Sequence, residues 1–162
     1  MHKSIFIIRH AKSSWNLPVK DIERPLNDRG LRDAPIMGEI FKRLIAPLLK
    51  VVSSPANRAH QTAIIFMEAC NISEKIILDE SLYYGEEEDY LSAIQTIEDK
   101  YNSVAIFGHN PKVENFSRNI HDGYHGEIPT CAIMQFGCTV EHWKEVEWNN
   151  IKFVNKYFPK KI

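Results

Sequence analysis

Arginine and histidine side chains follow three apolar, strand-like runs of this sequence. Arg9 and His10 come directly after the run 5–8, Arg58 follows the run 48–52 by a short turn, and His109 follows the run 104–107. Open α/β sheets bind ligands beyond the carboxyl ends of their strands, so we expect these side chains to meet at one sheet edge. Guanidinium groups bind phosphoryl oxygens through paired N–H groups, and a neutral imidazole is a nucleophile near pH 7. The spacing therefore predicts an anion-binding site with an imidazole available to attack phosphorus.

Three residues of the long polar loop after His10 are further candidates for this site. Arg24 would add a third guanidinium around the anion, and Asn16 could donate its amide to a phosphoryl oxygen. Asp21 could orient an imidazole or donate a proton. An exposed ion pair in a long loop explains Asp21 and Arg24 equally well. Glu86 follows a strand-like run and could reach the site, although an acidic residue there also suits a helix N-terminus.

The composition is that of one globular domain. The chain has 162 residues, 44% of them hydrophobic, and a formal net charge of -1 at pH 7, which excludes the basic field typical of nucleic-acid binding. The N-terminus has no apolar segment of the signal-peptide kind, and no apolar run approaches the roughly 20 residues of a membrane span. Cys70, Cys131 and Cys138 are odd in number and lack metal-ligand spacing, so we expect buried thiols, no disulfide and no metal site. We expect a monomer in a reducing cytoplasm.

Alternating strand-like and helix-like segments predict an α/β fold. The pattern favours a single domain over residues 1–162 with three layers, in which helices cover both faces of a mostly parallel central sheet. Asn27 is a suitable cap for the first long helix, while Pro35 predicts a kink in that helix or a start nearer Asp33. The expected strands are 4–8, 48–52, 75–78, 104–107, 131–136 and 151–154, and the expected helices are 27–45, 56–70, 86–101 and 111–121.

Several short motifs occur in a fixed order along the chain. They are Arg9-His10, then Ser54-Pro55 with Arg58-Ala59 and Thr62, and then Gly108-His109. Together they resemble the histidine phosphatase superfamily, whose members include phosphoglycerate mutases and acid phosphatases. Residues 9–16 with 24–30 are most similar to its SixA-like phosphohistidine phosphatases. The resemblance covers residues 5–119, and the chain has no room for the inserted helices of larger relatives.

The resemblance implies a phosphoglycerate mutase-like fold and a phosphatase mechanism in which a histidine of the enzyme itself is phosphorylated as an intermediate. It makes His10 the nucleophile, which is transiently phosphorylated and then hydrolysed by water. It implies no metal ion and no other cofactor, because guanidinium groups neutralise the phosphoryl charge. The residues that would surround the phosphoryl group are Arg9, Arg58 and His109, with Arg24 and Asn16 as additions.

The chain departs from the family pattern at two places. Ala11 stands where the family commonly has glycine, as it does in SixA-like chains that carry Arg-His-Ala-Lys. Mutase-like members carry a glutamate before the glycine that corresponds to Gly85, and this chain has Ser81 at that position. The candidates for a proton donor are therefore Asp21, Glu86 and Glu80.

The missing glutamate bears on the substrate. An alkoxide leaves poorly without a positioned acid, whereas the imidazole of a phosphoramidate leaves well once solvent has protonated it. We therefore hypothesise that the substrate is a phosphohistidine side chain on a partner protein, with Asp21 as the candidate proton shuttle. A phosphatase for a small phosphoester, with Glu80 or Glu86 as the acid, is the first alternative. The second is a non-catalytic module that binds phosphate through its arginines, although two histidines at the site argue against it.

Overall fold

Six strands form the central sheet of the computed structural model, which describes residues 1–160. They are β1 (His2–Arg9), β2 (Leu49–Ser53), β3 (Ile76–Leu78), β4 (Ser103–Gly108), β5 (Ile133–Thr139) and β6 (Ile151–Tyr157). The order in the sheet is β3-β2-β4-β1-β5-β6. The first four strands in this order are parallel, β5 is antiparallel to β1, and β6 is antiparallel to β5. The prediction of a mostly parallel sheet is confirmed.

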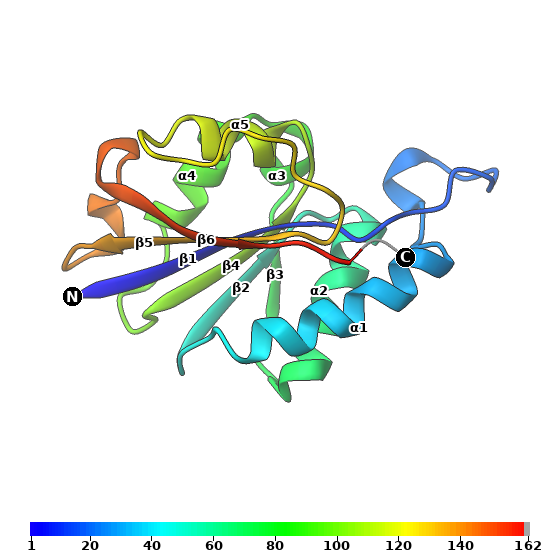
Figure 1. Ribbon diagram of the computed structural model, residues 1–162, viewed down its shortest axis with the longest axis horizontal. Helices are drawn as coiled ribbons and strands as arrows, with labels where there is room; N and C mark the ends of the chain where they lie inside the picture. Colours follow the sequence, from blue (N-terminus) through cyan, green and yellow to red (C-terminus); the bar gives the residue numbers. More distant parts are fainter. Residues whose placement is uncertain (161–162) are drawn as a thin grey trace.

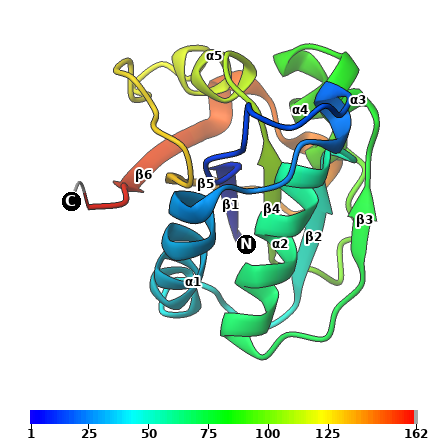
Figure 2. The ribbon, with the colours of Figure 1, turned by 90° about the vertical axis from the view of Figure 1, so that its right-hand side faces the viewer.

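Helices cover both faces of this sheet (Figures 1 and 2). The pair α1 (Asp28–Lys42) and α2 (Asn57–Cys70) lies on one face, and α4 (Glu87–Gln95) and α5 (Lys112–Arg118) lie on the other. The expected three-layer α/β/α arrangement is therefore present. The short elements are the helix α3 (Ser81–Tyr84) and the 3-10 turns η1 (Asp21–Glu23), η2 (Trp143–Glu145) and η3 (Trp148–Asn150).

Each face of the sheet has its own apolar core. On one face Phe41 of α1 packs against Phe6 of β1 at 5.0 Å between ring centroids, and against Phe66 of α2 at 5.7 Å. On the other face Tyr90 of α4 and Phe116 of α5 are fully buried. Burial of each such ring contributes about 1.5–3 kcal/mol. The two cores hold the helices against the sheet and so fix where the strand ends and helix starts meet.

The first helix begins where its cap predicts and continues through its proline. The Asn27 side chain accepts a hydrogen bond from the Gly30 amide at 2.9 Å. Pro35 lies inside α1, so a start nearer Asp33 is wrong, and the helix ends at Lys42 instead of residue 45. The cap and the burial of Met37 on the core face outweigh the one hydrogen bond that a proline removes.

The segment predicted as helix 86–101 is shorter in the structure. α4 ends at Gln95, and residues 96–102 form turns. Ile97 and Tyr101 are buried as the helical pattern requires, but they reach the core from these turns. The preceding helix α3 was not predicted, because a single turn is too short to show a periodic pattern.

The three cysteines are free thiols. Cys131 and Cys138 are buried as expected, whereas Cys70 at the end of α2 is half-buried, so the expectation is wrong for this residue. Among the described residues, no helix has the length and apolar character needed to cross a membrane.

Candidate active site

The strand ends bring the predicted arginines and histidines together. Arg9 ends β1, His10 follows it, Arg58 lies in the first turn of α2, and His109 follows β4. The two imidazole rings are 5.2 Å apart between centroids. A cavity of about 300 Å³ opens beside them, and its walls include all four side chains together with Arg24. β4, the strand before His109, pairs in parallel with both β1 and β2, so the carboxyl ends of all three strands meet at one edge of the sheet.

The hydrogen bonding of His10 fixes which ring nitrogen is free. Its Nδ1 lies 2.7 Å from the carbonyl oxygen of Ala11. A carbonyl oxygen can only accept, so Nδ1 carries the proton and Nε2 keeps its lone pair. Burial, followed by the nearby charges of Arg58 and Arg9, lowers the pKa of His10 to about 3. The ring is therefore neutral at pH 7, with Nε2 available as a nucleophile.

His109 is also buried and neutral. Its Nε2 lies 2.7 Å from the hydroxyl oxygen of Ser54, and its backbone N–H donates to the Tyr90 hydroxyl at 3.1 Å. Burial, followed by the charges of His10 and Arg58, lowers the pKa of the ring to about 2. Ser54 therefore orients a histidine of the site, and α2 begins at Asn57 without a side-chain cap.

Three buried nitrogen atoms of the site have no hydrogen-bond partner among the described residues. They are Nε of Arg9, Nε of Arg58 and Nδ1 of His109, and no other buried side-chain nitrogen or oxygen atom of residues 1–160 is in this state. Leaving a buried polar group unpaired is costly, and native proteins do so rarely outside functional sites. All three atoms belong to residues that line the cavity, and the Nε–H groups of Arg9 and Arg58 are donors that an oxyanion could satisfy.

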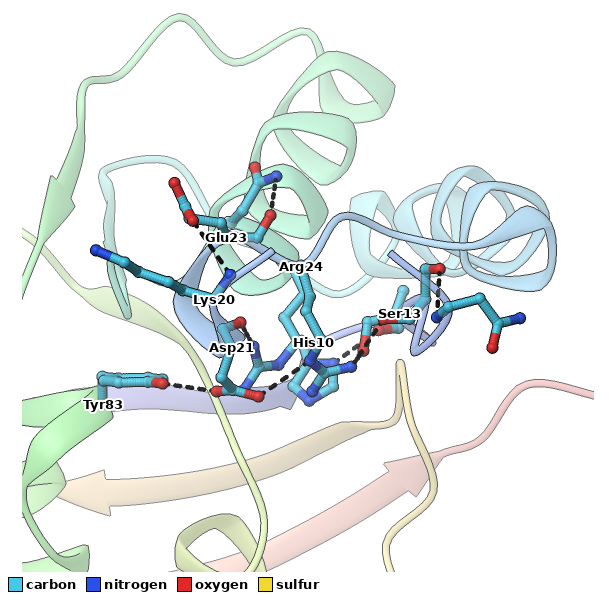
Figure 3. Close-up of polar contacts among 12 residues, drawn as sticks. His10, Ser13, Lys20, Asp21, Glu23, Arg24 and Tyr83 are labelled. Carbon is cyan, nitrogen blue, oxygen red and sulfur yellow. Dashed lines mark hydrogen bonds and ion pairs between the residues drawn. The ribbon is translucent and has the colours of Figure 1, made fainter. Parts of the chain in front are cut away.

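Asp21 links two of the guanidinium groups (Figure 3). Its carboxylate accepts from Nε of Arg24 at 3.0 Å, from Nη2 of Arg58 at 3.1 Å and from the hydroxyl of Tyr83 at 2.6 Å. Its backbone carbonyl accepts from Nη1 of Arg58 at 2.8 Å. The hydrogen bond from Tyr83, followed by those from Arg24 and Arg58, holds the pKa of Asp21 well below its usual range. Asp21 is therefore an ionised carboxylate that lines the cavity.

Arg24 is fixed from several sides. Its Nη1 donates to the Ser13 hydroxyl at 2.6 Å and to the Ser14 carbonyl at 3.2 Å. The exposed ring of Trp15 stacks on the guanidinium at 3.5 Å. The loop itself is closed by a bridge between Ser13 and Leu26. The guanidinium is buried in spite of its position in a long loop.

The remaining candidates lie outside the cavity. Asn16, Glu80 and Glu86 are exposed, and none of them is among the residues that line it. Within residues 1–160, no group of three or more His, Cys, Asp or Glu side chains lies close enough to hold a metal ion.

Sequence reasoning missed the residues that orient the site from a distance. Tyr83 is 62 residues from its partner Asp21, and Tyr90 is 19 residues from His109. No local pattern marks either tyrosine.

Comparison with known proteins agrees with this geometry. Residues 5–84 match the model of the histidine phosphatase superfamily, branch 1, and the match includes His10, Arg24 and Arg58. An uncharacterized protein of Mycobacterium tuberculosis is 24% identical over 94% of this chain and its own entire length.

Solved structures extend the likeness to the whole chain. A SixA protein from Agrobacterium tumefaciens has a TM-score of 0.79 and 25% identity, covering 98% of this chain and 99% of that chain. The protein histidine phosphatase SixA complexed with tungstate has a TM-score of 0.80 and 21% identity, covering 96% and 97% of the two chains. A mycobacterial glucosyl-3-phosphoglycerate phosphatase has a TM-score of 0.69 and 11% identity, covering 94% and 97%.

The chain belongs to the histidine phosphatase superfamily, branch 1. Within this superfamily it is SixA-like, with a phosphoglycerate mutase-like fold, which confirms the family and the fold class predicted from the sequence.

Proposed function

We propose that the protein is a phosphatase that forms a phosphohistidine at His10 and removes phosphate from a phosphohistidine side chain of another protein. The observation that carries the proposal is the neutral His10 ring, with Nε2 free, beside the unpaired Nε–H groups of Arg9 and Arg58 and the unpaired Nδ1 of His109. Since these donors can neutralise the phosphoryl charge, the proposal includes no metal ion and no other cofactor.

The reaction runs in two displacements at phosphorus. The phosphoryl oxygens bind to the free N–H groups of Arg9 and Arg58 and to His109 in the tautomer that carries its proton on Nδ1, with Arg24 nearby. Nε2 of His10 attacks phosphorus while the P–N bond to the substrate imidazole breaks, and that imidazole takes a proton from solvent. Water then attacks phosphorus of phospho-His10, which releases inorganic phosphate and restores the neutral ring. Asn16 would join only if its exposed loop moved toward the bound phosphoryl group.

The ionisation state of Asp21 favours a phosphoramidate over a phosphoester. Two guanidinium groups and a tyrosine hydroxyl keep this carboxylate ionised, so it is a weak proton donor. Glu80 and Glu86 are exposed and do not line the cavity. A phosphoester that must expel an alkoxide needs a positioned acid, whereas a protonated imidazole leaves without one. Asp21 remains the proposed shuttle for protons that pass between solvent and the site.

The proposed partner is a protein that carries phosphohistidine, and the proposed active form is a monomer. The free thiols of Cys70, Cys131 and Cys138 suit a reducing cytoplasm, which is the proposed location.

The test is phosphate release from a phosphohistidine-bearing protein and from an aryl phosphate, measured side by side with His10→Ala as the control. We expect rapid release from the protein substrate and none from the variant. Turnover of the aryl ester alone would replace the proposal with a small-molecule phosphatase. Phosphate binding without turnover of either substrate would instead favour a non-catalytic binding module.

A further inference from the structure

Tyr83 is held at two points beside the cavity. Its hydroxyl donates to Oδ2 of Asp21 at 2.6 Å, and its backbone carbonyl accepts from the Lys112 ammonium at 2.8 Å. Its ring lies edge-on to His109, with 5.5 Å between centroids and an angle of 74° between planes. Figure 3 shows the phenol directed toward the carboxylate. Tyr83 therefore connects α3 to the loop that carries Asp21.

The hydrogen bonds of Asp21 determine which N–H groups of Arg24 and Arg58 remain available to a ligand. The carboxylate occupies Nε of Arg24 and Nη2 of Arg58, while the Asp21 carbonyl occupies Nη1 of Arg58. The Nε of Arg58 is left without a partner among the described residues. The bridging position of one carboxylate thus sets the orientation of both arginines in the cavity.

An oxyanion in the cavity can accept from the Nε–H of Arg58 that Asp21 leaves free, while its charge attracts both guanidinium groups away from the carboxylate. The Asp21 side chain is 48% exposed, so water can also hydrate the carboxylate and weaken its hydrogen bonds to the two arginines. The Tyr83 hydroxyl is a neutral donor to this carboxylate, and a phosphoryl group bound to the guanidiniums does not remove it. The bond from Tyr83 can therefore keep Asp21 in place while a phosphoryl group binds.

We propose that Tyr83 is a positioning residue that acts through Asp21, holding Arg24 and Arg58 in the orientation that binds the phosphoryl group. The proposal rests on the proposed function, because it assumes that a phosphoryl group binds in the cavity. It adds Tyr83, which lies outside every motif of the sequence analysis, to the residues that determine phosphoryl binding. The same hydrogen bond is the largest cause of the lowered pKa of Asp21, and it also raises the pKa of Tyr83, so the phenol keeps its proton as a donor.

Two neighbouring tyrosines allow a matched comparison. Tyr84 follows Tyr83 in α3, its ring lies 4.8 Å from that of Tyr83, and it is 70% exposed. Tyr83→Phe removes the hydroxyl and keeps the ring contacts with His109 and Tyr84. Tyr84→Phe removes a hydroxyl one residue away that has no side-chain hydrogen bond to the site.

The experiment measures the dissociation constant of inorganic phosphate by calorimetry, together with kcat and KM on the phosphohistidine protein. Loss of a hydrogen bond to a half-exposed carboxylate should weaken phosphate binding in Tyr83→Phe roughly three- to tenfold. We expect KM to rise with it, kcat to change less, and the thermal unfolding midpoint to stay near that of the wild type. Tyr84→Phe should bind phosphate like the wild type. A purely structural role would move the unfolding midpoint and leave phosphate affinity unchanged.

A double-mutant cycle tests whether the effect passes through Asp21. In an Asp21→Ala background, Tyr83→Phe should produce no further loss of phosphate affinity. Equal losses in both backgrounds would overturn the inference, as would unchanged affinity in Tyr83→Phe alone. These results leave the proposed function intact, whereas a wild-type protein that binds no phosphate and releases none would remove both.

Discussion

Two buried, neutral histidines should make the protein sensitive to mild acid. Burial and the neighbouring guanidinium groups lower the pKa of His10 to about 3 and that of His109 to about 2. Both values lie below the value of about 6.5 for an unfolded chain. Between about pH 6.5 and pH 3 these two histidines bind protons in the unfolded chain but not in the folded protein. Stability is therefore full above about pH 6.5 and is lost as the pH falls toward 3.

The size of the loss follows from the same values. Between about pH 6.5 and pH 4.5, protonation of one histidine in the unfolded chain alone lowers the free energy of unfolding by about 2 kcal/mol. His10 and His109 together should remove about 4–5 kcal/mol, a large part of an ordinary domain's stability. The folded pKa of Asp21 is lowered, so its own contribution is lost only below about pH 4, outside this window.

The assay is urea unfolding followed by circular dichroism at the two pH values, in buffers without phosphate or other oxyanions. His10→Asn, which removes the titrating ring, should reduce the loss by about 2 kcal/mol. His121→Asn is the control, because that side chain is 95% exposed. An equal loss of stability in wild type and His10→Asn would show that His10 is not a neutral buried group in the folded protein.

Three further predictions concern the site and its support. Ser54→Ala removes the partner of Nε2 of His109, and we expect the initial rate on the phosphohistidine protein to fall roughly tenfold; an unchanged rate would show that this contact is dispensable. In Gly30→Ala the new Cβ would collide with the Lys12 carbonyl oxygen, so urea unfolding should show a loss of at least about 1 kcal/mol; wild-type stability would contradict this. Phosphate at about one hundred times its dissociation constant should raise the thermal midpoint by about 5–10 °C, and Arg58→Ala should abolish the rise.

The fold was predictable where periodic apolar patterns are long. All six strands of the sheet and the positions of α1, α2 and α5 follow from apolar runs and capping residues. The errors occur where tertiary packing competes with local preference. Pro35 is tolerated inside α1 because its helix is capped and packed, and Ile97 is buried from a turn although its spacing suits a helix.

The part of the site formed by residues that follow strands could be predicted from the sequence. Arg9, His10, Arg58 and His109 lie together because the sheet edge gathers the residues that follow its strands. Asn16 was placed near the phosphoryl group from its position after His10, but loop geometry leaves it exposed and outside the cavity. The contacts of Asp21 depend on how a long loop folds back over α2 and α3, which no periodic pattern encodes.

The atom that fixes the His10 ring belongs to the main chain. Because the Ala11 carbonyl oxygen blocks Nδ1, a phosphoryl group delivered to this ring is joined to Nε2, so only one of the two isomers of phosphohistidine can form. A substitution can slow this transfer by moving a side chain, but no single substitution deletes a carbonyl oxygen. The turn after β1 therefore determines the regiochemistry of the proposed intermediate, which should be the same in every variant that keeps that turn.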